Sequence, residues 1–239
     1  MIKLEDLKID IYADGADFAS ILKLNNNSMI KGFTTNPTLM KKAGVANYKD
    51  FAIELLKVIK DKPISFEVFS DEIEEMETQA REISSWADNV YVKIPVTNSK
   101  GLSTKEIISN LSNDNINLNV TAVFTLDQVK GIISSVNNKS NTIISIFAGR
   151  IADTGVDPIP LMQKSVNLSK INTKIKILWA SPRELLNIIH ADKSGCQIIT
   201  VAEDIIKKLN LVNKDLQEFS LETVKMFYDD AQKVGYKIL

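Results

Sequence analysis

The run from Val90 to Thr97 carries a lysine, Lys93, among residues that otherwise predict a buried strand. Lysine is rarely buried unless it is paired, and burial disfavours the ammonium form of the side chain. An amine that is neutral near pH 7 can attack a carbonyl group and form a Schiff base. Lys93 is therefore a candidate covalent catalyst. The simpler alternative is an edge-strand lysine whose ammonium group reaches solvent.

Two carboxylates, Asp14 and Glu67, lie in or at the end of other strand-like runs. Together with Lys93 they fit the cleavage of a carbon–carbon bond beside a ketone. An iminium nitrogen on Lys93 would draw electrons from the breaking bond, and carboxylates can perform the proton transfers that the cleavage requires. We expect Asp14 to move protons on the substrate hydroxyl. We expect Glu67 to act with a bound water while the carbinolamine forms and breaks down.

The elements that could position these side chains recur along the chain. Apolar, often β-branched runs predict strands near 8–13, 30–34, 63–69, 90–95, 117–124, 141–147, 174–180 and 197–201. The segments between them have helical spacing of apolar residues, and alternating strands and helices predict a parallel sheet. Eight such units in 239 residues predict one (β/α)8 barrel domain over residues 1–239, with an additional C-terminal helix. An open doubly wound sheet is the alternative, but its usual Gly-rich phosphate loop is missing after the first strand.

The reaction site of a (β/α)8 barrel lies at the carboxyl ends of its strands. Besides the three residues above, the predicted strand ends carry Thr34, Asn36, Asn119, Thr121, Ser145, Phe147, Arg150, Ser181 and Arg183. Converging polar groups need a reason, because each costs free energy unless it is paired. Arg150, Ser181 and Arg183 could hold a phosphate by charge-assisted hydrogen bonds. The N-terminus of a helix beginning near Ser181 would add backbone donors.

Charge and composition disfavour several classes of partner. The 29 Lys and Arg residues nearly balance 30 Asp and Glu residues, so we expect neither nucleic acid nor a membrane surface as a partner. A single cysteine fits a reducing compartment, and the N-terminus lacks an apolar signal core, so we expect a cytoplasmic protein. The only histidine, His190, has no evident partner ligands, and we expect no metal or other cofactor.

Seven pieces of the chain resemble the transaldolases, including the short fructose-6-phosphate-aldolase-like branch. The pieces are Ile11–Asp14, Gly32–Leu39, Phe66–Val68, Val92–Thr97, Asn119–Thr121, Phe147–Ile151 and Ala180–Arg183. They occur in family order and cover the predicted barrel from end to end. The run Thr34-Thr35-Asn36-Pro37 and the run Val92–Thr97 are specific when they occur together.

The resemblance implies a role for each site residue. It implies that Lys93 forms the Schiff base, that Asp14 is the acid and base at the cleaved bond, and that Glu67 activates the catalytic water. It also implies contacts with substrate hydroxyls from Thr34, Asn36, Asn119 and Ser145. Arg150, Ser181 and Arg183 would face the phosphate of a sugar-phosphate substrate.

Two positions separate the branches of this family. The chain is similar to true transaldolases at both, because they have Glu and Phe where Glu67 and Phe147 stand, and the aldolase branch has Gln and Tyr. Our first hypothesis is a transaldolase that moves a dihydroxyacetone unit between sugar phosphates. The second is an aldolase that releases dihydroxyacetone, or an enzyme for an unusual sugar, because Gly15 and Pro182 depart from the usual residues. The third is a phosphosugar-binding protein without catalysis.

The segment at about 215–239 lies beyond the eight units that close a barrel, yet it carries an apolar stripe that includes Phe219, Val224 and Phe227. Such stripes tend to mark an interface when they are exposed. Packing on its own barrel is the alternative. Because the chain resembles short family members that form pentamers or decamers through an extra C-terminal helix, we expect a homo-oligomer.

Overall fold

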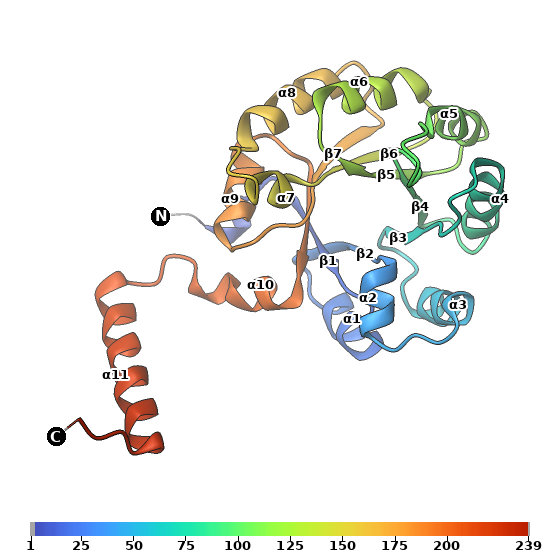
Figure 1. Ribbon diagram of the computed structural model, residues 1–239. Coiled ribbons are helices and arrows are strands. Elements are labelled where there is room, and N and C mark those ends of the chain that lie inside the picture. Colours follow the sequence, from blue (N-terminus) through green and yellow to red (C-terminus); the bar gives the residue numbers. More distant parts are fainter. Residues whose placement is uncertain (1–2, 239) are drawn as a thin grey trace.

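A computed structural model describes residues 3–238. Eight parallel strands form a closed barrel in which each strand pairs with the next and β8 pairs with β1 (Figure 1). The strands are β1 (Asp10–Asp14), β2 (Ile30–Thr34), β3 (Ile64–Glu67), β4 (Val90–Pro95), β5 (Leu118–Val123), β6 (Thr142–Ile146), β7 (Ile175–Trp179) and β8 (Ile198–Ala202). The predicted (β/α)8 barrel is confirmed, and every observed strand lies within two residues of its predicted position.

Helices surround the barrel and connect its strands (Figure 1). They are α1 (Phe18–Asn25), α2 (Pro37–Lys42), α3 (Tyr48–Val58), α4 (Ile73–Ser84), α5 (Lys105–Asn113), α6 (Leu126–Ser135), α7 (Ala148–Ala152), α8 (Ile159–Ser169), α9 (Leu186–Lys193), α10 (Glu203–Lys207) and α11 (Leu216–Val234), with short 3-10 turns at Leu4–Asp6 and Lys208–Leu211. Local sequence sets several boundaries. Asn36 caps α2 before Pro37, and Thr125 forms a capping box with Gln128 at the start of α6.

Two separate apolar regions hold the barrel together. The larger lies between the strands and the helices, where residues such as Phe66, Leu55 and Met76 are buried. The smaller lies inside the barrel and contains Tyr12, Ile143, Leu178 and Ile198, the residues that we call the floor. Successive side chains of a strand point to opposite faces, so every second residue of each strand faces the barrel interior.

The barrel interior changes character along the strands. Two residues beyond the floor positions, on the same face, stand Asp14, Ser145 and Thr200, and Lys93 lies in the same way two residues beyond Tyr91. We call this polar layer at the carboxyl ends of the strands the mouth. The floor is tightly filled at Gly32, where an added Cβ would lie 2.6 Å from ring atoms of Tyr12.

Helix α11 projects away from the barrel (Figure 1) and has no buried residue. Its boundaries are locally encoded, because Asp215 accepts hydrogen bonds from the backbone amides of Gln217 and Glu218, and Gly235 ends the helix with a φ of 73°. Because no residue of α11 is buried, the alternative that this segment packs on its own barrel is wrong. Within the described residues, no helix combines the length and apolar character that a membrane crossing requires.

Candidate active site

A cavity of about 100 Å³ lies at the mouth of the barrel. Its walls are Asp14, Thr34, Asn36, Lys93, Thr121, Ser145, Phe147, Arg150, Ala180, Ser181 and Thr200. Nine of the twelve residues expected from the sequence are among them. The other three are Glu67, which pairs with Lys93; Asn119, which is hydrogen-bonded to Ser145; and Arg183, which lies outside the cavity wall.

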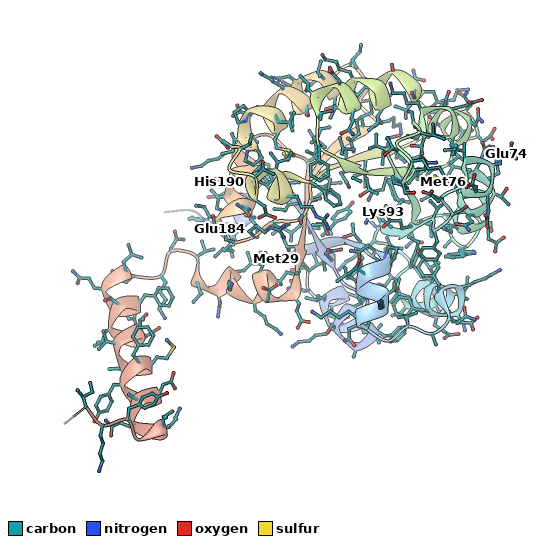
Figure 2. The ribbon with its side chains drawn as sticks, viewed as in Figure 1. Met29, Glu74, Met76, Lys93, Glu184 and His190 are labelled. Atoms are coloured by element: carbon teal, nitrogen blue, oxygen red, sulfur yellow. The ribbon has the colours of Figure 1, made fainter. Side chains whose placement is uncertain are left out.

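Lys93 is 7 % exposed and lies inside the ring of strands, whereas Glu74 and Met76 belong to the surrounding helix layer (Figure 2). Its Nζ atom lies 3.1 Å from Glu67 Oε2 and donates a hydrogen bond of 3.1 Å to the backbone oxygen of Thr35. Neighbouring strands explain the pair, since Glu67 and Lys93 are register partners in β3 and β4. The alternative of a lysine that reaches solvent is therefore wrong, because the amine is held inside the barrel beside a carboxylate.

Asp14 ends β1 and faces the same cavity. Its Oδ1 atom accepts a 2.8 Å hydrogen bond from Thr34 Oγ1, and the Thr34 hydroxyl also lies against the Thr200 hydroxyl. Burial raises the pKa of the Asp14 carboxyl above its usual value, although the charge of Lys93 and the Thr34 hydrogen bond act in the opposite direction. A carboxyl group whose pKa is raised in this way is suited to giving and taking a proton.

A chain of buried hydrogen bonds crosses three strands beside Lys93. Ser145 Oγ donates to Asn119 Oδ1 at 2.6 Å, and Asn119 Nδ2 donates to Ser65 Oγ at 2.9 Å. Asn119 is fully buried and is the register partner of Lys93 in the next strand. The network holds the Asn119 side chain from both sides, because each amide atom is hydrogen-bonded to a serine hydroxyl.

Two further cavity residues have hydroxyl or amide groups with spare capacity. Asn36 Oδ1 accepts from the backbone nitrogen of Leu39 as a helix cap, and the amide nitrogen of Asn36 is available to a ligand. Thr121 Oγ1 is buried and has no hydrogen-bond partner among residues 3–238. A buried hydroxyl without a partner is costly, which marks Thr121 as a group that a ligand could satisfy.

The side of the cavity formed by β6 and β7 is cationic and aromatic. The Arg150 guanidinium lies 5.4 Å from the ring centroid of Phe147. Ser181 has a φ of 60°, and its backbone oxygen would lie 1.5 Å from a Cβ added to Gly149. This loop conformation therefore requires glycine at position 149, next to Arg150. Arg150 and Ser181 can together contact an anion here.

Arg183 is oriented differently from the other predicted anion ligands. Its Nε atom donates to Asp153 Oδ1 at 3.0 Å, and its Nη2 atom contacts the other carboxylate oxygen of Asp153. The ion pair raises the pKa of Arg183 and lowers that of Asp153. Arg183 therefore ties the loop after β7 to the end of α7.

Sequence reasoning missed several residues around Lys93. Thr200 lines the cavity, and its signal was available, because a threonine interrupts the apolar face of the eighth predicted strand. Ser65 likewise interrupts the apolar run of the third predicted strand. Thr35 acts through its backbone oxygen and Tyr48 contacts backbone atoms of Glu67, and neither role has a sequence signal. Among residues 3–238, no group of three or more His, Cys, Asp or Glu side chains is placed to hold a metal ion.

Solved structures similar to this chain share its barrel. N-acetylneuraminate lyase from Mycoplasma synoviae superposes with a TM-score of 0.55 at 10% identity, over 93% of this chain and 80% of that one. Dihydrodipicolinate synthase from Rhodopseudomonas palustris gives a TM-score of 0.54 at 13% identity, over 84% of this chain and 71% of that one. At these identities the likeness concerns the fold alone.

Sequence comparison is more specific. Residues 11–238 match the family model described as Transaldolase/Fructose-6-phosphate aldolase. A protein named "Probable transaldolase" from Streptococcus agalactiae serotype V is 33% identical over 93% of this chain and 98% of its own length. Another of that name from Thermoanaerobacter sp. is 32% identical over 95% of this chain and 99% of its own length. The chain thus belongs to the transaldolase/fructose-6-phosphate aldolase family and is a transaldolase-type enzyme.

Proposed function

We propose that this protein is a transaldolase that transfers a dihydroxyacetone unit from a ketose phosphate to an aldose phosphate through a Schiff base on Lys93. The donor would be sedoheptulose 7-phosphate or fructose 6-phosphate, with glyceraldehyde 3-phosphate or erythrose 4-phosphate as acceptor. The observation that carries the proposal is the buried Lys93 amine, paired with Glu67 and sharing one cavity with Asp14.

The two carboxylates divide the proton transfers according to their positions. Glu67 lies 3.1 Å from Lys93 Nζ, so it can take the proton that the amine must lose and act on the water released from the carbinolamine. Asp14 lines the cavity and accepts a hydrogen bond from the Thr34 hydroxyl. A raised pKa allows Asp14 to take the proton of the substrate hydroxyl during cleavage and return it to the acceptor aldehyde oxygen.

The polar groups around the cavity would orient the sugar. The amide nitrogen of Asn36 and the free hydroxyl of Thr121 can meet substrate hydroxyls, and Ser145 and Asn119 form a polar wall beside Lys93. Arg150 and Ser181 would bind the phosphate. Arg183 would join them only after leaving Asp153, so we propose a second role for it as a tie between two loops.

The covalent step is tested by trapping. Borohydride reduction in the presence of fructose 6-phosphate should add a dihydroxyacetone-derived mass to the peptide that contains Lys93. The control is the Lys93→Arg variant, which keeps a positive charge beside Glu67 but does not form a Schiff base. Label on another lysine, or none on the wild type, would remove Lys93 from the chemistry.

Release of free dihydroxyacetone, the reaction of the aldolase branch, is the competing activity. We expect Phe147 and Glu67 to favour transfer to an acceptor over this release. In the presence of an acceptor aldose phosphate, transfer product should greatly exceed free dihydroxyacetone. We expect Glu67→Gln combined with Phe147→Tyr to shift the ratio toward release. A wild-type enzyme that mainly releases dihydroxyacetone would show that these two positions do not set the branch.

We further propose that α11 packs against another copy of this chain. Its apolar side chains are exposed, with Leu216 at 79 %, Phe227 at 63 % and Tyr228 at 64 %, and no residue of the helix is buried by its own barrel. Exposed stripes of this extent are typical of interfaces, and resemblance to ring-forming relatives favours a pentamer or decamer.

A cytoplasmic location remains a prediction from the sequence.

Light scattering tests this assembly. Deleting the chain after Lys214 should lower the number of subunits in the particle. The circular dichroism spectrum should lose only the helical signal of α11, because α11 contributes nothing to the core of the barrel. A full-length protein that is monomeric at micromolar concentration would contradict the proposal.

A further inference from the structure

The backbone hydrogen bonds between β2 and β3 stop just before Glu67, the residue that pairs with Lys93. Phe33 N donates to Pro63 O at 2.8 Å, and Thr35 N donates to Ser65 O at 3.2 Å. A parallel ladder continues with evenly spaced bonds, so the next one would join Glu67 N to Thr35 O. These two groups have other partners. Thr35 O accepts from Lys93 Nζ, and Glu67 N donates to Tyr48 Oη at 2.8 Å.

The Tyr48 hydroxyl replaces a strand partner for Glu67. It accepts from Glu67 N at 2.8 Å and donates to Glu67 O at 3.0 Å, so one side-chain atom satisfies both backbone groups of that residue. On the other side of β3, Val68 N donates to Lys93 O at 3.1 Å. The end of β3 is thus held between the Tyr48 side chain and the backbone of β4.

Packing fixes the ring that carries this hydroxyl. Tyr48 is the first residue of α3, and its ring centroid lies 4.3 Å from that of Phe69, 6.0 Å from Trp86 and 6.1 Å from Phe66. Burial raises the pKa of the Tyr48 phenol further above its usual value, so the hydroxyl keeps the proton that it donates to Glu67 O. The side chain therefore acts as a fixed hydrogen-bonding group rather than a mobile one.

Both polar neighbours of Lys93 depend on this arrangement. Because Tyr48 takes the Glu67 amide, the Thr35 carbonyl is available to the Lys93 amine, and the Glu67 carboxylate stands 3.1 Å from the same amine. We infer that Tyr48 is a positioning residue for the reaction at Lys93: its hydroxyl keeps β2 and β3 apart at Thr35 and Glu67, and so sets both acceptors around the amine. This inference rests on the proposed Schiff-base function.

The test is Tyr48→Phe, which removes one oxygen atom and keeps the ring among its aromatic neighbours. Without the hydroxyl, Glu67 N can close the ladder onto Thr35 O and withdraw that carbonyl from Lys93. We expect kcat to fall by about 10-fold to 100-fold, since small misplacements of catalytic groups cost rates of this order, while KM changes little. The rate of borohydride trapping at Lys93 should fall in proportion to kcat.

Phe69→Leu is the matched control, because it loosens the packing around the Tyr48 ring but leaves the hydroxyl in place. A purely structural role predicts that both variants lose melting temperature and activity together. Wild-type kcat and trapping rate in Tyr48→Phe, or equal losses in the two variants, would overturn the inference. If the wild type itself is not labelled at Lys93, the proposed function fails first, and the inference falls with it.

Discussion

The floor and the mouth of this barrel are only two residues apart along the strands, yet one is a filled apolar layer and the other is a polar layer around a cavity. At the floor, Tyr12, Ile143, Leu178 and Ile198 form an apolar cluster that fills the interior. At the mouth, Asp14, Lys93 and Ser145 surround a cavity. Burying ionisable groups costs free energy that apolar side chains would not. The comparison indicates that the floor contributes more to the free energy of unfolding than the mouth does. At the mouth, polar and ionisable groups that lower stability are kept for the proposed reaction. Substitutions in each layer can test this division.

The largest expected effect is at Lys93. Lys93→Met removes the nucleophile, so activity should fall by about 10⁴-fold or more, as for other covalent catalysts. A far-ultraviolet circular dichroism spectrum like that of the wild type and retained binding of inorganic phosphate would show that the loss is chemical. Undiminished turnover would remove Lys93 from the mechanism.

Thr121 and Thr142 offer a matched pair of buried hydroxyls. Neither has a hydrogen-bond partner among residues 3–238, but Thr121 lines the cavity and Thr142 lies at the opposite end of the barrel, at the start of β6. Replacing an unpaired hydroxyl by an apolar group of the same shape is nearly neutral or stabilising. We therefore expect both Val variants to melt at or above the wild-type temperature.

Only Thr121→Val should impair catalysis, by about 2-fold to 10-fold in kcat/KM, because one hydrogen bond to substrate contributes roughly 0.5–1.5 kcal/mol. Steady-state kinetics of the two variants side by side provide the measurement. Equal activities would mean that the Thr121 hydroxyl does not meet the substrate.

Gly32→Ala tests the floor. The added Cβ would lie 2.6 Å from the Tyr12 ring, and overpacking of a filled core costs about 1–3 kcal/mol. Urea denaturation should show the loss as a lower midpoint, with a smaller change in the activity of the folded protein. A variant as stable as the wild type would show that the floor has room that the structure does not suggest.

The smallest expected effect on stability comes from Asp14→Asn, a variant that should also lose most of its activity because an amide cannot replace the proposed acid and base. Burial raises the folded-state pKa of Asp14, so folding favours the protonated form. That contribution is fully present below the pKa of an unfolded aspartate, about 3.9, and is lost as pH rises through the folded-state value. At a pH above the folded-state pKa the buried carboxylate is charged and costs stability that a neutral amide does not, and an amide can still accept the Thr34 hydrogen bond.

We expect Asp14→Asn to melt about 2–4 °C above the wild type at pH 7, which corresponds to about 1 kcal/mol in a chain of this size. The difference should shrink as the pH is lowered. A variant that melts below the wild type at pH 7 would mean that attraction between Asp14 and Lys93 outweighs the cost of burial.

The residues that we propose carry the chemistry were largely visible in the sequence, because a strand has a strict period of two. A lysine or carboxylate within an apolar run stands out, and so do Asn119, Thr121 and Ser145. Arg183 shows the limit of this reasoning. It follows Ser181 closely in the chain, yet its guanidinium pairs with Asp153, because the loop after β7 turns at Ser181 with a positive φ.

The sequence by itself determined the strand positions and the alternation of strands and helices, and it predicted the three residues that we propose react, Asp14, Glu67 and Lys93. These depend on local periodicity and on residue type. Only the tertiary structure decided that Lys93 pairs with Glu67, that Tyr48 takes the place of a strand partner, and that α11 leaves the barrel. Such contacts join residues far apart in the chain, and they depend on register and closure, which no local pattern specifies.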